Sequence, residues 1–185
     1  MRSFIAIELP DTVKSALLSL QQKLKTCGAD VRWVRPEGIH LTLKFLGDIE
    51  DKLVDRIIET LKGTCIKFKT FSCEVRGIGV FPTARAPRVL WAGIADHDAL
   101  TLIQQEIDIG MSSLGFEREN RKFTAHLTLG RFRSSEGKIA LLDKIEAHKE
   151  LTLGIIDVNH ISLMRSELGP AGAKYARIAE IPLGK

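Results

Sequence analysis

The stretch GIHLTLKFLGD, Gly38 to Asp48, contains the tetrapeptide His-Leu-Thr-Leu, and TAHLTLGRF, Thr124 to Phe132, contains it again. Alternating apolar and polar residues are typical of a β-strand with one buried face, so both stretches are predicted to be strands. Leucine and threonine suit a strand, whereas histidine contributes little to one. Two identical copies therefore indicate an internal repeat whose histidines serve a purpose other than strand formation.

The segments around the two tetrapeptides recur in the same order. Both halves are predicted to run strand, helix, strand, helix, strand, and 36 residues separate Phe4 from His40 while 37 separate Val89 from His126. A repeat at matched spacing indicates two similar lobes. We expect the repeat to span about residues 3–81 and 88–166, followed by a closing strand at 173–183, within a single domain of residues 1–185.

The predicted fold class is α+β, with two pseudo-symmetric lobes that each consist of an antiparallel sheet with helices on one face. The two His-Leu-Thr-Leu strands are expected to face each other across a central cleft. Because side chains alternate along a strand, His40 and Thr42 share one face, and so do His126 and Thr128. The leucines of both motifs point to the opposite face, toward the core.

Two imidazoles and two hydroxyls in one cleft suit the cleavage of a phosphodiester. Hydrolysis needs a base to activate water and an acid to protonate the leaving oxygen, and imidazole can serve as either near neutral pH. Hydroxyl groups can hold the phosphoryl oxygens, whose charge grows in the transition state. Neither tetrapeptide contains a carboxylate, so no metal is expected. The residues themselves leave open which histidine is the acid.

Longer stretches carry a resemblance to a known family. RSFIAIELP, RWVRPEGIHLTLKFLGD, GVFPTARAPRVLWAGI and FTAHLTLGRF occur in the order found in the two-histidine phosphoesterase superfamily. Nearly the whole chain is similar to the RNA 2′,3′-cyclic phosphodiesterases of that superfamily, also called 2′-5′ RNA ligases. One departure is Ala125, where the family often has proline, and this concerns backbone stiffness rather than chemistry.

The resemblance implies metal-independent hydrolysis of RNA 2′,3′-cyclic phosphate ends to 2′-phosphomonoesters, with ATP-independent 2′-5′ ligation as the reverse reaction. It implies that His40 is the proton donor, that His126 is the proton acceptor, and that Thr42 and Thr128 hold phosphate oxygens. It implies no cofactor. The expected partner is an RNA with a 2′,3′-cyclic phosphate end or a nucleoside cyclic phosphate, and no obligatory protein partner is expected.

Phe45 and Arg131 both lie five residues after a motif histidine. The resemblance implies that Arg131 contacts phosphate and that Phe45 lies against a nucleobase. In a regular strand a side chain at an odd offset from the histidine points to the core. The sequence therefore leaves two possibilities for Phe45, a core position and a stacking position. An arginine is seldom buried unpaired, and a bulge or strand end next to Gly130 would turn Arg131 into the cleft.

Bulk properties agree with this interpretation without deciding it. A net charge of +4 and a pI of about 9.0 favour polyanions such as RNA, although many proteins this basic bind none. Arg76, Arg85 and Arg88 either add positive charge near the cleft or lie on a solvated surface. No apolar run is long enough for a membrane helix or a signal peptide, and three cysteines form no pair motif. We therefore expect a cytoplasmic protein with free thiols and no membrane contact.

Two other functions stay open on sequence grounds. The chain could bind nucleotides or RNA ends without turnover, although a pure binding module has little need of two imidazoles. It could also cleave a small cyclic nucleotide metabolite instead of RNA. Turnover of a nucleoside 2′,3′-cyclic phosphate separates the enzyme from the binding module. The remaining histidines, His97, His148 and His160, are assigned no role.

Overall fold

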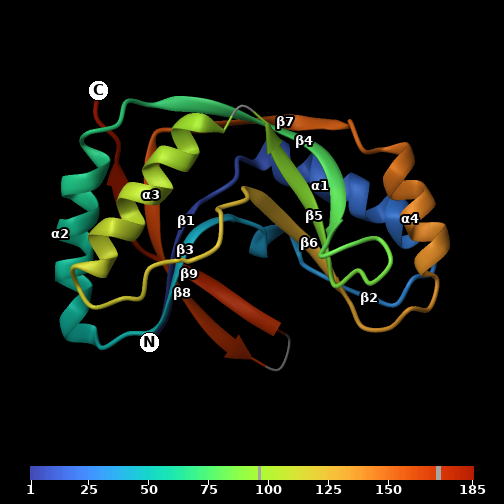
Figure 1. Ribbon diagram of the computed structural model, residues 1–185, viewed down its shortest axis with the longest axis horizontal. Coiled ribbons are helices and arrows are strands. Elements are labelled where there is room, and N and C mark those ends of the chain that lie inside the picture. Colours follow the sequence, from blue (N-terminus) through green and yellow to red (C-terminus); the bar gives the residue numbers. More distant parts are fainter. Residues whose placement is uncertain (96, 170–171) are drawn as a thin grey trace.

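Two antiparallel sheets and four α-helices make up the protein in the computed structural model, which describes residues 1–95, 97–169 and 172–185 (Figure 1). The strands are β1 (Arg2–Ile7), β2 (Val31–Trp33), β3 (Leu41–Asp48), β4 (Phe71–Phe81), β5 (Val89–Ala95), β6 (His126–Phe132), β7 (Thr152–Val158), β8 (His160–Gly169) and β9 (Gly172–Pro182). The helices are α1 (Asp11–Lys25), α2 (Val54–Cys65), α3 (Asp98–Ser112) and α4 (Lys138–Ala147), with short 3₁₀ turns at η1 (Pro36–Gly38) and η2 (Asp51–Leu53). The predicted α+β class is confirmed.

The sheets have the strand orders β3-β1-β8-β9 and β2-β6-β5-β4-β7, and every pairing between these strands is antiparallel. The neighbouring strands β3-β1-β8 of the four-stranded sheet correspond to the neighbouring strands β6-β5-β4 of the five-stranded sheet. The two strands that carry the motifs, β3 and β6, therefore have equivalent neighbours. This correspondence is the pseudo-symmetry that the doubled tetrapeptide predicts.

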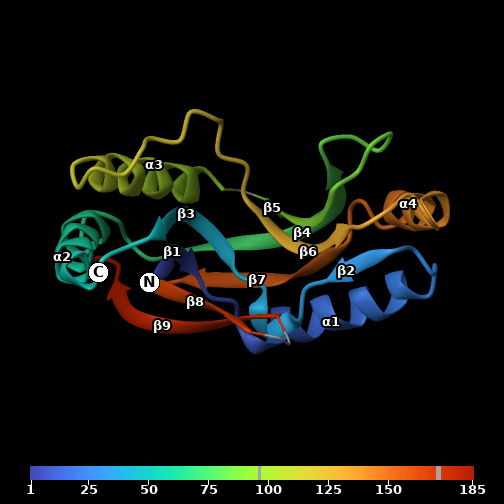
Figure 2. The same ribbon diagram turned by 90° about the horizontal axis from the view of Figure 1, so that it is seen from below.

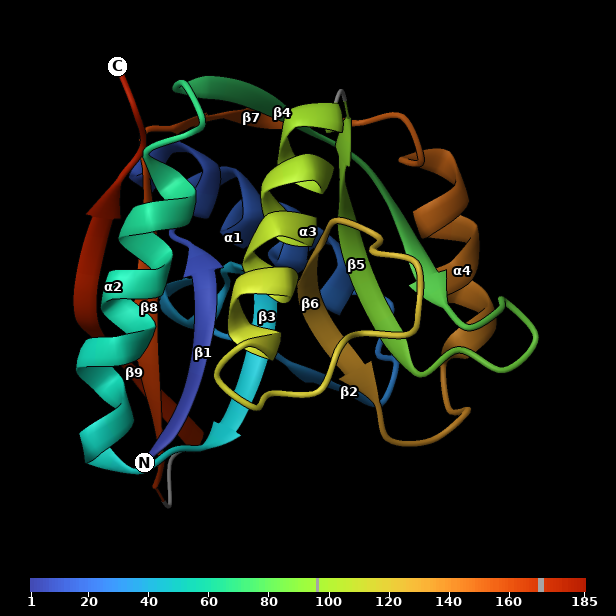
Figure 3. The same cartoon turned by 60° about the vertical axis from the view of Figure 1, so that its left-hand side comes forward.

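Each sheet draws strands from both halves of the chain. The four-stranded sheet combines β1 and β3 with β8 and β9, and the five-stranded sheet combines β2 and β4 with β5, β6 and β7. The helices are exchanged as well, in the sense that α1 and α3 each pack on the sheet that does not contain the strand before them. Although α1 follows β1, it packs against β7 and α4, whereas α3 follows β5 but lies beside α2 and β3 (Figure 3). A lobe of the structure is therefore not the same piece of chain as one sequence repeat, whose boundaries stay a prediction.

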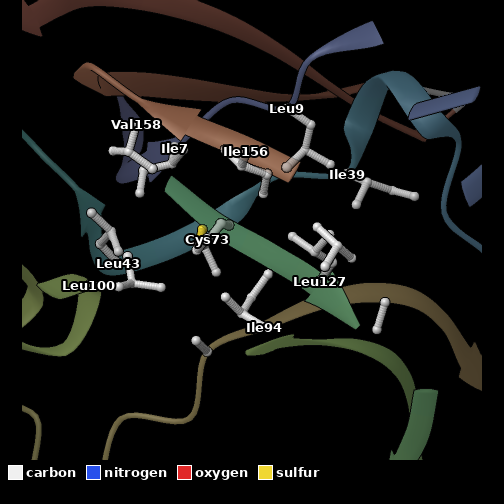
Figure 4. Close-up of a cluster of buried hydrophobic side chains, with 14 of the residues drawn as sticks. Ile7, Leu9, Ile39, Leu43, Cys73, Ile94, Leu100, Leu127, Ile156 and Val158 are labelled. Atoms are coloured by element: carbon white, nitrogen blue, oxygen red, sulfur yellow. The ribbon is translucent and has the colours of Figure 1, made fainter. Parts of the chain in front are cut away.

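One apolar core joins the two sheets. Leu41 and Leu43 of the first motif, and Leu127 and Leu129 of the second, are at most 3% exposed. Figure 4 shows Leu43 and Leu127 in one cluster with Cys73. Burying a leucine side chain stabilises a fold by about 1.5–3 kcal/mol, so the leucine faces anchor both motif strands on the same support. The opposite faces remain for the histidines and threonines.

The three cysteines are free thiols, as expected from the sequence. Burial raises the pKa of Cys65 to about 12. Burial, with a smaller contribution from the charge of Asp157, raises the pKa of Cys73 to about 11. Both of these thiols therefore stay protonated and unreactive near neutral pH. None of the described helices is long and apolar enough to span a membrane.

Candidate active site

A β-bulge interrupts β3 three residues after His40. Neighbouring residues of β1 pair with Thr42 and with Lys44, which leaves Leu43 as an extra residue between the two pairs. A bulge of this kind reverses the alternation of side chains beyond it. The side chain of Phe45 therefore returns to the face of the histidine, where it is 71% exposed. Phe45 is a surface residue and not a core residue.

An equivalent bulge interrupts β6 three residues after His126. Neighbouring residues of β5 pair with Thr128 and with Gly130, so that Leu129 is the extra residue. Beyond the bulge, Arg131 lies on the same side of the sheet as Thr128, and its side chain is exposed. The bulge anticipated next to Gly130 is confirmed, and both residues five positions after a histidine leave the core in the same way.

A buried glutamine from the exchanged helix binds the bulge in each lobe. Gln21 of α1 donates its side-chain amide to the carbonyl oxygens of Leu129 at 2.9 Å and Val34 at 2.7 Å. Gln104 of α3 donates to the carbonyl oxygen of Leu43 at 3.3 Å. The two glutamines are 1% and 5% exposed, so water does not compete for these bonds. Because a buried carbonyl left unpaired costs about 1–3 kcal/mol, the glutamines stabilise the bulged strands.

The imidazole of His40 is packed among aromatic rings just before β3. It stacks on Phe4 with 4.5 Å between ring centroids and 25° between planes, and it meets the edge of Tyr175 at 5.0 Å and 74°. Burial lowers the pKa of His40 to about 4, although a hydrogen bond with the backbone of Gly38 and the charge of Glu8 act in the opposite direction. His40 is therefore neutral at pH 7 in the free protein.

His126, the first residue of β6, is held by the backbone of Thr124. Its Nδ1 lies 2.7 Å from the carbonyl oxygen of Thr124. A carbonyl oxygen only accepts hydrogen bonds, so Nδ1 carries the proton and Nε2 of the neutral ring is free to accept one. The ring meets Phe81 edge-on, with centroids 5.2 Å apart and planes at 89°. Both histidines thus meet an edge-on aromatic ring, Tyr175 for His40 and Phe81 for His126.

The two motif strands approach each other between the sheets. Cα atoms of β3 and β6 come within 8 Å, and Figure 2 shows these strands in the middle of the molecule. Thr42 and Thr128 are half-buried on the faces of their histidines. A pocket of about 450 Å³ is lined by His126, Phe81 and Trp91 but not by His40. The single cleft that holds both histidines therefore stays a prediction.

Arg131 lines a different pocket, of about 540 Å³, at the far end of β6. Phe45 lies instead beside the aromatic group of His40, with its ring centroid 6.1 Å from that of Phe4. Within residues 1–95, 97–169 and 172–185, no group of three or more His, Cys, Asp or Glu side chains could hold a metal ion.

A buried ion pair connects β3 to α3 and to the loop that leads to β6. Lys44, on the core side of the first bulge, donates to Asp108 at 2.5 Å and to the carbonyl oxygen of Glu117 at 2.8 Å. Asp108 also accepts hydrogen bonds from Arg118 and from the backbone N–H of Glu119. Burial acts to raise the pKa of Asp108, but the hydrogen bonds from Lys44 and Arg118 outweigh it and hold the pKa below its usual value. The network ties β3 to α3 and to the loop that precedes β6.

The sequence alone did not identify the residues that surround the histidines and the bulges. A signal was present for the glutamines, because each exchanged helix contains a Gln-Gln pair whose first member falls on the apolar face, at Gln21 and Gln104. No comparable signal marks Phe4 or Tyr175. Phe4 resembles any other apolar strand residue, and Tyr175 follows His40 by 135 positions.

Two His-Leu-Thr-Leu strands on equivalent positions of two antiparallel sheets define a two-histidine phosphoesterase. The chain belongs to the LigT-like phosphoesterase family, which it matches over residues 7–91 and 93–175. The resemblance inferred from the motifs is confirmed. The roles of the individual residues stay predictions.

Relatives and solved structures agree with this assignment. The chain is 34% identical over 175 residues to the RNA 2′,3′-cyclic phosphodiesterase of Methanothermobacter thermautotrophicus, covering 95% of each protein. It is 34% identical over 180 residues to that of Methanocaldococcus jannaschii, covering 97% of this chain and 99% of the other. A crystal structure from Thermus thermophilus matches all of both chains with a TM-score of 0.83 and 26% identity. E. coli LigT in complex with 3′-AMP shares the fold, with a TM-score of 0.77 and 21% identity over 100% of this chain and 98% of its own.

Proposed function

We propose that this protein hydrolyses RNA 2′,3′-cyclic phosphodiester ends to 2′-phosphomonoesters without a metal ion. The observation that carries the proposal is the pair of imidazoles at the starts of two equivalent strands, each of which meets an edge-on aromatic ring. Relatives named RNA 2′,3′-cyclic phosphodiesterase that are 34% identical over nearly the full length support the substrate class. Neither motif supplies a carboxylate that would bind a divalent cation.

In the proposed reaction a water molecule attacks phosphorus in line with the 3′ oxygen. Nε2 of His126 accepts the proton of the water as the new P–O bond forms, and His40 gives a proton to the 3′ oxygen as the P–O3′ bond breaks. The hydroxyl groups of Thr42 and Thr128 donate to the non-bridging oxygens. Arg131 adds positive charge to the phosphate site, and Phe45 offers an exposed ring to the terminal base.

The lowered pKa of His40 constrains this assignment. A histidine that acts as a general acid must be the imidazolium, whereas His40 is neutral at pH 7 in the free protein. The phosphodiester is an anion, and an opposite charge beside an imidazole raises its pKa. We therefore assign the protonation of His40 to the moment of substrate binding. The reverse assignment, with His40 as the base and His126 as the proton donor, agrees better with the free protein but departs from the roles that the family resemblance implies.

Ligation is the same displacement run backwards. A 5′-hydroxyl group takes the place of water, and the 2′-5′ linkage forms without ATP because the cyclic phosphate already holds the energy of the bond. A cytoplasmic location remains a prediction, as does the absence of an obligatory protein partner.

The test is product identification after incubation with an RNA oligonucleotide that ends in a 2′,3′-cyclic phosphate. We expect a 2′-phosphate product, formed equally well in EDTA. A 3′-phosphate product would overturn the placement of His40 beside the 3′ oxygen. Loss of turnover in EDTA, restored by a divalent ion, would overturn the metal-free mechanism. Binding of the oligonucleotide with no turnover would favour the binding module.

A further inference from the structure

The pocket that contains Arg131 has two walls that are tied together. One wall is the loop between β4 and β5, and the other runs from the end of β6 to the start of α4; Figure 1 shows these segments side by side. The backbone N–H of Phe132 donates to the carbonyl oxygen of Arg88 at 3.0 Å. The side chain of Lys138 donates to the carbonyl oxygen of Arg85 at 3.0 Å. These bonds join the two walls through backbone carbonyl oxygens and use no carboxylate.

Five cationic side chains line this pocket. They are Arg85, Arg88, Arg131, Arg133 and Lys138, and among the described residues that line it none is acidic. None of the five takes part in an ion pair within the described part of the chain. The formal charge of the whole chain is only +4, so this one pocket gathers more positive charge than the net charge of the protein.

Such a concentration of like charges disfavours the fold through mutual repulsion unless an anion binds there. The pocket is open, and its four arginine side chains are exposed. Ser134 and Ser135 add hydroxyl donors to the lining. A preformed, positively charged groove with hydroxyl donors suits a chain of phosphates better than a single small anion.

The pocket continues the candidate active site along β6. Arg131 lies three residues after Thr128, which is about 10 Å along a strand. A cyclic phosphate occupies the 3′ end of an RNA, so every other nucleotide lies on its 5′ side. An RNA whose terminal phosphate lies at Thr128 can therefore place its next phosphates in the pocket.

We propose that this basic pocket, formed by Arg85, Arg88, Arg131, Arg133 and Lys138, binds the phosphates of the nucleotides upstream of the cyclic end. The proposal rests on the proposed function, because it takes the RNA end to lie at the two histidines. The pocket makes an RNA strand a better substrate than a cyclic mononucleotide with the same base. It assigns Arg85 and Arg88 to the RNA-binding surface, where the sequence left them open between this role and a solvated surface.

The test compares kcat/KM for a cyclic-phosphate-ended oligonucleotide and for the matching cyclic mononucleotide over a series of salt concentrations. Each phosphate contact to a single strand adds about −0.7 to the slope of log affinity against log salt, so two contacts weaken binding roughly sevenfold between about 50 and 200 mM salt. We expect this steep dependence for the oligonucleotide and a shallow one for the mononucleotide.

The double variant Arg85→Ala/Arg133→Ala removes two cations that lie away from the histidines. We expect the ratio of oligonucleotide to mononucleotide kcat/KM to fall and the salt slope for the oligonucleotide to become shallower by about 0.7 for each phosphate that the variant no longer binds. The control is Arg56→Ala, which removes one exposed arginine from α2, outside the pocket. Equal ratios and slopes in the double variant and the control would overturn the proposal.

A binding measurement separates this proposal from the proposed function. Fluorescence anisotropy with a labelled RNA that ends in a 2′-phosphate needs no turnover. Weaker, less salt-dependent binding by Arg85→Ala/Arg133→Ala than by Arg56→Ala supports the pocket even if neither cyclic substrate is cleaved. Hydrolysis of both substrates with unchanged RNA binding in the double variant would retain the enzyme and reject the pocket.

Discussion

Leu43 and Leu129 occupy equivalent positions in the two sheets, because each is the extra residue of a bulge that lies three residues after a motif histidine. Each bulge carbonyl accepts a hydrogen bond from a glutamine of the helix that belongs, in chain order, to the other sheet. The bulge lets a leucine stay in the core while the threonine before it and the residue five positions after the histidine share the functional face.

Replacement of Gln104 by leucine is expected to lower kcat for a cyclic mononucleotide at least several-fold. The variant leaves the carbonyl of Leu43 unpaired, and the strand can relieve the loss of about 1–3 kcal/mol by shifting the bulge and with it Thr42. Stability from urea unfolding and steady-state kinetics are measured together. The control is Gln105→Leu, at the exposed neighbouring position. Equal kcat in the two variants would show that the hydrogen bond serves stability alone.

The motif histidines are expected to dominate turnover. His40→Ala and His126→Ala should each lower kcat by about 10²-fold or more, as is usual for a lost general acid or base. His148→Ala serves as the control, because the ring of His148 pairs with the carbonyl of Lys144 at the end of α4. Near wild-type kcat in both motif variants would rule out acid–base catalysis by this pair.

His40 is expected to titrate with a pKa of about 4 in the free protein when followed by NMR. Addition of a nucleoside 2′-phosphate should raise that pKa, because the phosphate anion favours the imidazolium. Tyr175→Ala should also raise it, by giving the ring access to water. A pKa near the unperturbed value of about 6.5 in the free protein would contradict the burial of the ring.

The pH dependence follows from the same shift. A required proton donor makes activity fall as pH rises through its pKa, and a required base makes activity fall as pH drops. The kcat profile should therefore be bell-shaped, with limbs that belong to the coupled pair. The limb that reports the protonated donor should lie at higher pH in kcat than in kcat/KM, since the latter reports the free enzyme. Coincident limbs in both profiles would show that substrate does not protonate His40.

Lys44→Met is expected to destabilise the fold by about 3–5 kcal/mol, because it leaves the carboxylate of Asp108 buried beside β3 without its lysine. The double variant Lys44→Met/Asp108→Leu should be more stable than Lys44→Met alone, since neither charge then remains buried. Urea unfolding of the wild type, of both single variants and of the double variant measures the difference. Additive losses in the double variant would show that the two residues do not interact.

Fold class and motif strands could be predicted because they depend on local pattern. The alternation in His-Leu-Thr-Leu places Leu41 and Leu127 in the core whatever the topology. The faces of Phe45 and Arg131 depend on bulges, and a bulge is a property of two paired strands that neither Leu43 nor Leu129 marks by its identity. Phe45 could therefore not be assigned from the sequence.

The exchange of helices could also not be predicted from the sequence. An apolar stripe on α1 shows that the helix is amphipathic but does not say which sheet receives it, because both sheets offer an apolar face. The lowered pKa of His40 can be predicted only if it is known that Tyr175, from the last strand, packs on the ring. Contacts between distant segments carry that information, and local periodicity does not.

The position of β1 in the middle of its sheet has a consequence for synthesis on the ribosome. β1 emerges long before β8, with which it pairs and which ends at Gly169. At about 5–20 residues per second, β8 emerges roughly 8–30 s after β1. Until then one edge of β1 has no partner and can recruit strands of other chains. A nascent or prematurely terminated chain therefore has an aggregation-prone edge, and the aromatic wall around His40 is completed only when Tyr175 arrives.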